Sequence, residues 1–182
     1  YLIETEGCVD SEIPHWQDDA WYWKKEATDW GWDWASEKEK HLHPKYAPVN
    51  RYAADIIGCL NNWVDGWIDW NMVLDRQGGP NWFKNWCVAP VIVDPEKDEV
   101  YFTPLYYVMA HFSKFMRPGA VKIGCTISNK ELMATAVKNL DGSIAVAIFN
   151  SSDQSYSIEL KLNNKITKIT IPAKALQTVV IK

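Results

Sequence analysis

The spacing of apolar residues changes near Pro118-Gly119, and this change constrains the fold more than any other feature of the sequence. Before it, short apolar runs alternate with stripes of apolar residues spaced three or four apart; after Val121, apolar and polar residues alternate. The first spacing is typical of helices and the second of strands with one wet face. We therefore expect an α/β part over residues 1–117 and an all-β part over residues 118–182.

Two strands and two helices are predicted in the first part. Residues 1–5 and 66–72 have the apolar character of short buried strands. A helix is expected from Asn50, a suitable N-cap, with a stripe formed by Tyr52, Ile56, Cys59, Leu60 and Trp63. A second helix is expected to begin at Thr103-Pro104 and to stop before Pro118-Gly119. Strands that alternate with helices predict parallel pairing through helical crossovers, as in an α/β barrel or a doubly wound sheet.

The second part has the signals of an antiparallel domain. Asp141-Gly142 lies between apolar runs and predicts a hairpin turn. Residues 156–162 alternate apolar and polar side chains, Asn163-Asn164 predicts a turn, and two further strands follow. This pattern indicates a small sandwich-like domain of about five strands.

Charge and composition exclude several classes of function. The formal net charge is −4 and no run of Lys and Arg occurs, so nucleic-acid binding is not expected. The longest apolar runs, such as Val91-Ile92-Val93, are far shorter than a transmembrane helix. Of the histidines only His41 and His43 are closely spaced, and a metal site needs three or four converging ligands. We therefore expect a polar loop there and no metal site.

Tryptophan is distributed very unevenly along the chain. All eleven tryptophans lie between Trp16 and Trp86. Six of them fall in residues 9–48, a long stretch without sustained periodicity, and such long excursions inside compact domains are usually functional. Aromatic faces suit sugar rings and other flat ligands, but they also fill large cores. Binding and packing both remain open for this segment.

Chemistry in parallel α/β folds is expected at the carboxyl ends of strands. Glu6 followed by Gly7 lies at the first such end, and Asp69-Trp70 at the second. Glu6 could be a nucleophile, a general base, a metal ligand or a salt-bridged structural group. Trp70 could be a sugar platform or a core aromatic, and Asp69 could orient a loop.

Five blocks of sequence resemble the glucosylceramidase group of glycoside hydrolase family 30, in order and in approximate spacing. They are Leu2-Ile3-Glu4-Thr5-Glu6-Gly7-Cys8-Val9, Gly66-Trp67-Ile68-Asp69-Trp70-Asn71, Gly78-Gly79-Pro80-Asn81-Trp82, Pro90-Val91-Ile92-Val93-Asp94 and His111-Phe112-Ser113-Lys114-Phe115. The resemblance covers nearly the whole chain except residues 10–48. It implies the last two βα units of a (β/α)8 TIM barrel, followed by an antiparallel β-sandwich domain. Because the chain begins inside a strand and without Met, we expect a C-terminal portion of such an enzyme.

The resemblance also implies a site, residue by residue. Glu6 matches the catalytic nucleophile of the family, in the context Thr5-Glu6-Gly7-Cys8-Val9. Trp70 matches a tryptophan that lines the glucose pocket, Asn85 matches a pocket asparagine, and Trp86 occupies a neighbouring aromatic position. Asn85 and Trp86 could equally make contacts that fix their loop. The acid/base carboxyl of the family lies on an earlier strand, outside this chain, and no cofactor is implied.

The function expected from this resemblance is retaining hydrolysis of β-glucosides through a glycosyl-enzyme intermediate. The partners implied are a carbohydrate or glycolipid substrate and the remaining N-terminal part of the same enzyme. A secreted, periplasmic or lysosomal location is typical of the family. Two alternatives remain: a non-catalytic carbohydrate-binding or accessory module that uses the Trp-rich segment, and a structural fragment without activity. Among enzymes, a β-glucanase or a β-xylosidase is the alternative hypothesis. The chain alone is expected to be inactive.

Overall fold

The computed structural model describes residues 1–7, 47–75, 78–80, 87 and 89–182. Most of the Trp-rich segment, together with Asn85 and Trp86, lies outside the described residues. The chain divides into two compact units. The first comprises Tyr1–Tyr52 and Val64–Met109, and the second comprises Ala53–Trp63 and Ala110–Lys182.

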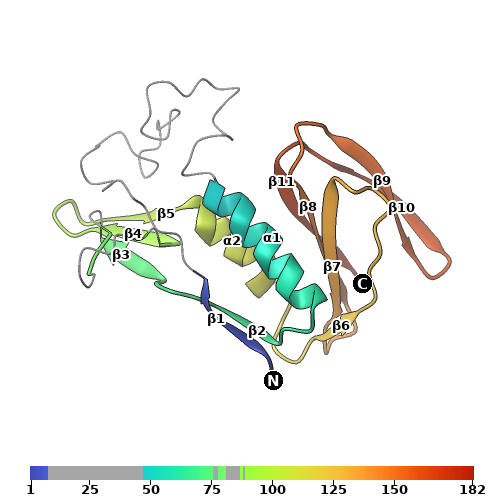
Figure 1. Ribbon diagram of the computed structural model, residues 1–182, viewed down its shortest axis with the longest axis horizontal. Coiled ribbons are helices and arrows are strands. Elements are labelled where there is room, and N and C mark those ends of the chain that lie inside the picture. The colour runs from blue at the N-terminus through green and yellow to red at the C-terminus, as the bar shows by residue number, and fades with distance from the viewer. Residues whose placement is uncertain (8–46, 76–77, 81–86, 88) are drawn as a thin grey trace. The chain divides into compact units, whose positions relative to one another are not determined.

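The first unit contains the predicted parallel strand pair. Strand β1 (Ile3–Gly7) is followed by helix α1 (Ala47–Asn61) and strand β2 (Gly66–Asp69), and β1 and β2 pair in parallel (Figure 1). Asp65 joins the amino-terminal ends of the two strands. Its amide donates to the Leu2 carbonyl at 2.7 Å, and its Oδ2 accepts from the Leu2 amide at 2.9 Å. The predicted strand–helix–strand order is therefore confirmed, although β2 ends at Asp69 rather than at residue 72.

Helix α1 begins at Ala47, so the prediction that Asn50 is its N-cap is wrong. Pro48 falls in the first turn, where proline is well tolerated because the first helical amides have no partner inside the helix. The buried side chains of α1 include Tyr52 and Ile56, as the stripe predicted. Trp63 does not belong to that buried stripe, because it lies beyond the end of the helix, is 77% exposed and has a φ of 66°.

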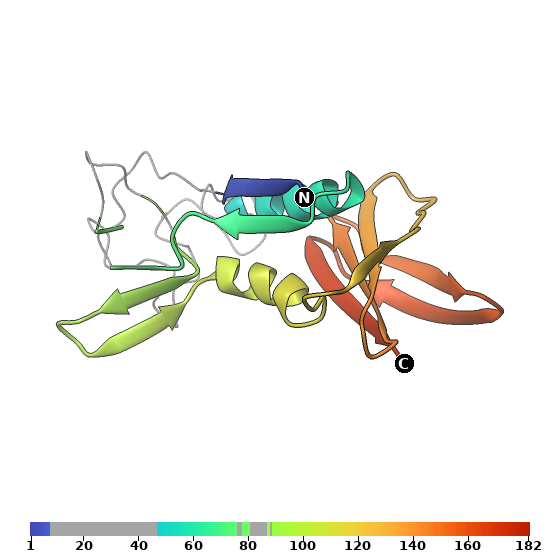
Figure 2. The same cartoon turned by 90° about the horizontal axis from the view of Figure 1, so that it is seen from below.

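Three short strands follow β2 in the first unit. Strand β3 (Val73–Asp75) pairs in parallel with β4 (Val91–Asp94), which pairs antiparallel with β5 (Glu99–Phe102); Figure 2 shows the β4–β5 hairpin. Thr103 connects β5 to helix α2 (Pro104–Ser113). Its hydroxyl donates to the Ala89 carbonyl at 2.8 Å, and its carbonyl accepts from the Tyr106 amide at 3.0 Å. Thr103 therefore fixes the start of α2 and joins it to Ala89, which precedes β4.

The second unit is built mainly from antiparallel strands. Strands β6 (Val121–Ile123), β7 (Leu132–Lys138), β8 (Ile144–Asn150) and β11 (Ala175–Ile181) form a four-stranded sheet in the order β11-β8-β7-β6. Strands β9 (Tyr156–Leu162) and β10 (Lys165–Ile171) form a separate hairpin. These are six strands, where about five were predicted from the sequence.

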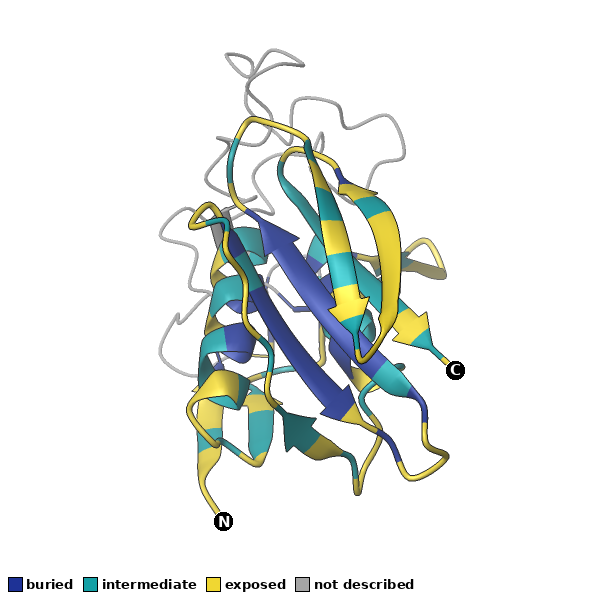
Figure 3. Cartoon of the chain, turned by 90° about the vertical axis from the view of Figure 1, so that its right-hand side faces the viewer, coloured by how far each residue is buried: buried dark blue, intermediate teal, exposed yellow. Residues whose placement is uncertain are grey.

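The hairpin and the sheet enclose one apolar core, which makes this region a sandwich. The buried members of this core are Leu132, Ala134, Ala136, Val146, Ile148 and Ile171, and alternate side chains of β9 pack against them. Figure 3 shows β7 and β8 almost entirely buried, whereas β9 alternates between intermediate and exposed residues and β10 is mostly exposed. The turn predictions are confirmed, since Gly142 and Asn163 adopt φ values of 85° and 52°. Among the described residues no helix is long and apolar enough to cross a membrane.

Burial of the parallel pair differs from the prediction of two buried strands. Leu2, Ile3 and Ile68 are about half exposed, at 56%, 48% and 50%. Strands β1 and β2 form a sheet of two strands, and such a sheet needs cover on both faces before its apolar side chains are removed from water. The apolar side chains of these strands are therefore only partly covered by the described residues.

Candidate active site

The strand pairing contains an irregularity at Glu6. Ile3 and Glu4 pair with Gly66 and Trp67, but Gly7 pairs with Asp69, so Thr5 and Glu6 face the single residue Ile68. One extra residue in a strand makes a bulge, which redirects the side chains next to it and is common beside active sites. The Glu6 side chain is exposed, and its amide donates to Glu4 Oε1 at 3.3 Å. Glu6 thus occupies a bulge at the carboxyl end of β1.

Gly7 is required by the packing of the neighbouring strand. A methyl group built on Gly7 would overlap the six-membered ring of Trp67. The Trp67 ring lies edge-on to the Tyr52 ring, with the centroids 4.9 Å apart and an interplanar angle of 70°. Glycine has no Cβ and so allows another group to approach the backbone closely. The group that approaches closely is the Trp67 indole.

Asp69 connects the carboxyl ends of the two strands. Its Oδ1 accepts from the Tyr52 hydroxyl at 2.6 Å and from the Trp70 amide at 2.9 Å. The same Trp70 amide donates to the Gly7 carbonyl at 2.8 Å. Asp69 Oδ2 is buried and has no hydrogen-bond partner among the described residues. Burial raises the pKa of this carboxyl, and the hydrogen bonds from Tyr52 and Trp70 oppose that rise.

Trp70 follows β2 directly and is 51% exposed in this chain, and its role as a sugar platform or a core aromatic stays a prediction. Gly7 of β1 pairs with Asp69 of β2. Glu6 comes directly before Gly7, and Trp70 comes directly after Asp69. The structure therefore brings both to the same end of the strand pair. Asn85 and Trp86 stay predictions, because they lie outside the described residues.

Tyr52 is the site residue that sequence reasoning missed. It occupies an apolar stripe of α1 and is 3% exposed, which is the pattern of an ordinary core residue. Only its hydroxyl group, which needs a partner when buried, distinguished it from the other stripe residues. Asp69 was recognised as able to orient a loop, and its contact with the Trp70 amide is of that kind.

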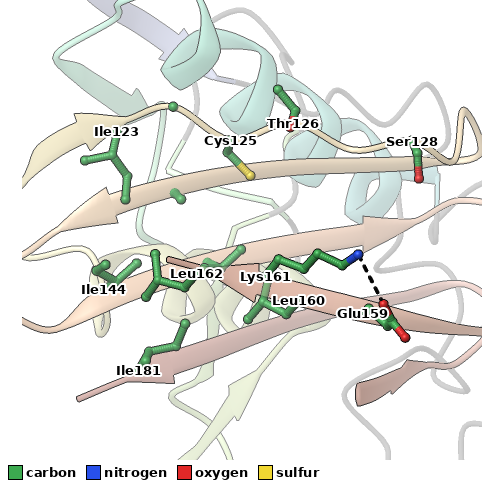
Figure 4. A pocket seen from close by; sticks show the side chains of 13 residues that line it. Ile123, Cys125, Thr126, Ser128, Ile144, Glu159, Leu160, Lys161, Leu162 and Ile181 are labelled. Atoms are coloured by element: carbon green, nitrogen blue, oxygen red, sulfur yellow. Dashed lines mark ion pairs between the residues drawn. The ribbon is translucent and has the colours of Figure 1, made fainter. Parts of the chain in front are cut away.

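A cavity of about 400 Å³ lies elsewhere, in the sandwich, between β9 and the segment that follows β6. Figure 4 shows apolar side chains such as Ile123, Leu160 and Leu162 around it. The one carboxylate on its wall, Glu159, pairs with Lys161 at 3.3 Å. Such a lining provides no pair of carboxyl groups for acid/base chemistry. Within the described residues there is also no cluster of His, Cys, Asp and Glu that could hold a metal ion.

Comparison with known protein families shows to which family this chain belongs. Residues 27–116 match the Glycosyl hydrolase family 30 TIM-barrel domain, and residues 119–179 match the Glycosyl hydrolase family 30 beta sandwich domain. This chain belongs to glycosyl hydrolase family 30. Trp70 lies inside the matched barrel range of this family-30 chain, and Glu6 lies before that range. The predicted order, a part of a TIM barrel and then a β-sandwich, is confirmed.

Three relatives illustrate the range of the family. A Caenorhabditis elegans protein with the provisional name glucosylceramidase 4 is 37% identical over 75% of this chain and 28% of its own length. The lysosomal acid glucosylceramidase of Mus musculus is 31% identical over 87% of this chain and 27% of its own length. An endo-1,6-beta-D-glucanase of Neurospora crassa is 30% identical over 78% of this chain and 28% of its own length. The chain thus spans little more than a quarter of these relatives.

A solved structure agrees with the fold. SrfJ from Salmonella typhimurium superposes with a TM-score of 0.80 at 24% sequence identity, over 100% of this chain and 35% of SrfJ. At this level of identity, the likeness supports the architecture and says nothing of the substrate.

Proposed function

We propose that the protein containing this chain is a retaining β-glycosidase whose nucleophile is Glu6. The observation that carries the proposal is the position of Glu6 in a family-30 chain: an exposed carboxylate in a bulge, at the carboxyl end of a parallel strand. Catalytic residues of barrel enzymes lie at this end of the strands. The alignment of Glu6 with the family nucleophile, made from sequence, agrees with this geometry.

The proposed chemistry proceeds in two displacements. The Glu6 carboxylate attacks the anomeric carbon, the glycosidic C–O bond breaks, and a second carboxyl group gives its proton to the leaving oxygen. Water, deprotonated by that second group, then attacks the glycosyl-enzyme and releases the sugar and Glu6. The two carboxyl groups of a retaining enzyme are about 5–5.5 Å apart. We propose that the second group lies in the remaining N-terminal part of the enzyme, with a domain boundary in this chain near residues 117–118.

Substrate contacts are proposed for three residues. Trp70 is suited to stack on a sugar ring because it is half exposed and adjacent to the strand end that carries Glu6. Asn85 and Trp86, which precede β4 in the sequence, are proposed to complete the sugar pocket. The substrate that we favour is a β-glucoside with a lipid aglycone. A β-glucan is the second candidate, because one relative is an endo-1,6-beta-D-glucanase.

The decisive experiment is covalent labelling of the full-length protein with a mechanism-based β-glucosidase inhibitor, followed by peptide mass spectrometry. We expect the label on Glu6. Glu6→Gln should abolish turnover while folding stays nearly intact, because an amide is a poor nucleophile. Glu4→Gln is the matched control, since it changes a carboxylate in the same strand but keeps the Oε1 acceptor that contacts the Glu6 amide. A Glu6→Gln variant that retains most of its activity would remove Glu6 from the nucleophile role.

Kinetics then separate the substrate classes. The ratio kcat/KM should be highest for glucosylceramide in detergent and lower for β-1,6-glucan and aryl β-xylosides. The opposite order would favour the β-glucanase or β-xylosidase alternative. Trp70→Ala should mainly raise KM. Sugar binding by a folded full-length protein that the inhibitor never labels would favour the non-catalytic module.

A further inference from the structure

We propose that Tyr52 and Asp69 form a positioning pair that holds the bulge of β1 and thereby aims the Glu6 carboxylate. The inference rests on the proposed function, because it concerns how the proposed nucleophile is oriented. Neither residue is proposed to touch the substrate. Their role is to fix the backbone on both sides of Glu6.

Tyr52 contacts one residue in each of the two β1–β2 residue pairs that flank the bulge. Its ring packs edge-on against Trp67, whose backbone is paired with Glu4 on the near side of the bulge. Its hydroxyl donates to Asp69, whose backbone is paired with Gly7 on the far side. A single rigid side chain from α1 therefore connects the two positions between which the extra residue of β1 is accommodated.

Asp69 transmits this connection to the β1 backbone. Its Oδ1 holds the Trp70 amide, and the same amide holds the Gly7 carbonyl one residue beyond Glu6. Trp67 restricts the β1 backbone further, because its ring fills the space that a side chain at residue 7 would occupy. The Glu6 backbone is thus bounded by fixed neighbours, whereas its side chain stays exposed.

The cost of this arrangement points to a purpose beyond strand pairing. Asp69 uses one oxygen for two hydrogen bonds and leaves Oδ2 buried without a partner among the described residues. A buried carboxylate oxygen without a hydrogen-bond partner lowers stability rather than raising it. The other end of the same strand pair is held by Asp65 at no such cost, since Asp65 is exposed. Among the described residues, the carboxyl end thus carries a desolvation cost that the amino end does not, and active sites commonly trade stability for fixed geometry.

The test compares substitutions at the two ends of the strand pair in the full-length enzyme. Tyr52→Phe should lower kcat about tenfold and Asp69→Ala about a hundredfold, with KM changed less than about threefold, because small misplacements of a reacting group are costly. The Tyr52→Phe, Asp69→Ala double variant should be no worse than Asp69→Ala alone, since the two act as one unit. Asp65→Ala is the matched control and should keep the wild-type kcat.

A conservative variant guards against simple misfolding. Asp69→Asn keeps an oxygen at Oδ1 and should retain at least about a third of the wild-type kcat. If Asp69→Asn and Asp69→Ala lose kcat equally, or if Asp65→Ala loses as much as Asp69→Ala, the positioning pair is refuted. The rate of Glu6 labelling gives the second readout, and it should fall in parallel with kcat. Wild-type enzyme that is never labelled at Glu6 would refute the proposed function instead, whereas normal labelling of Tyr52→Phe and Asp69→Ala would refute only this inference.

Discussion

The parallel pair β1–β2 and the sandwich sheet differ in regularity and in burial. Strands β7 and β8 pair without interruption from Leu132↔Asn150 to Lys138↔Ile144, and their side chains are almost all buried. Strands β1 and β2 are short, interrupted by a bulge and only partly buried. The sandwich sheet buries most side chains of its two central strands within this chain, whereas the apolar side chains of the parallel pair are about half exposed. The candidate active site lies at the parallel pair.

Separating the chain from the rest of the protein should produce the largest effect. Expressed alone, residues 1–182 should hydrolyse aryl β-glucosides at an undetectable rate. The proposed proton donor lies elsewhere in the protein, and general acid catalysis typically contributes about 10²–10⁴-fold. We also expect self-association, because apolar side chains of β1 and β2 face water. A fluorogenic glucoside assay and size-exclusion chromatography measure both; a well-behaved, active monomer would contradict the prediction.

Two isoleucines, one in each region, test whether other parts of the protein cover the parallel pair. Ile148 in β8 is 1% exposed and Ile68 in β2 is 50% exposed in this chain. In the full-length protein we expect Ile148→Ala and Ile68→Ala each to cost about 2–5 kcal/mol in free energy of unfolding, because the proposed barrel buries β2. Denaturant unfolding gives both values. A cost at Ile68 below about 1 kcal/mol would contradict closure of the barrel around β2.

Two glycines distinguish steric need from simple tolerance. Gly7→Ala should destabilise the full-length protein by about 1–3 kcal/mol, because the new methyl group overlaps the Trp67 ring. Gly58→Ala in α1 is the control, since its new methyl group meets no atom within 4 Å. It should stabilise the protein by about 0.5–1 kcal/mol, as alanine is the better helix former. Thermal unfolding measures both changes, and equal effects of the same sign would refute the packing argument at Gly7.

The smallest expected effect is an opposite pH dependence of two aspartates. Burial raises the pKa of Asp69 above 3.8, so the native state holds its proton longer than the unfolded state does. The contribution of Asp69 to stability therefore falls as pH rises above about 3.8 and through the raised pKa. Asp69→Asn, which cannot ionise, should gain stability relative to wild type over that interval.

Asp141 in the sandwich should show the reverse. Hydrogen bonds from the Ser143 hydroxyl and amide lower its pKa, so its contribution is present above about 3.8 and is lost as pH falls through the lowered pKa. Asp141→Asn should therefore lose stability relative to wild type as pH rises. Unfolding free energies of both variants and of wild type, measured between pH 3 and pH 7, test both predictions. If the two variants change in stability relative to wild type in the same direction as pH rises, the opposite pKa shifts of Asp69 and Asp141 are contradicted.

Local sequence patterns were enough to predict much of this fold. The alternation over residues 156–162 predicted β9 with its bounds, and Asp141-Gly142 and Asn163 marked their turns. Thr103-Pro104 predicted the start of α2. Other predictions differ from the structure: α1 begins at Ala47 rather than at Asn50, β2 ends at Asp69, and Ile3 and Ile68 are about half exposed in this chain. Burial of a strand depends on what packs over it, which its own residues do not encode.

The candidate site shows the same division. The sequence was enough to propose Glu6 and Trp70 as candidates, because a carboxylate and an aromatic residue at the ends of predicted strands are visible as types and positions. The bulge that presents Glu6, the Trp67 ring that requires Gly7, and the Tyr52–Asp69 contact came only from the tertiary structure. Turns and periodicity arise from interactions between near neighbours in the chain. Strand register and the partner of a buried hydroxyl depend on residues far apart in sequence, which meet only when the chain has folded.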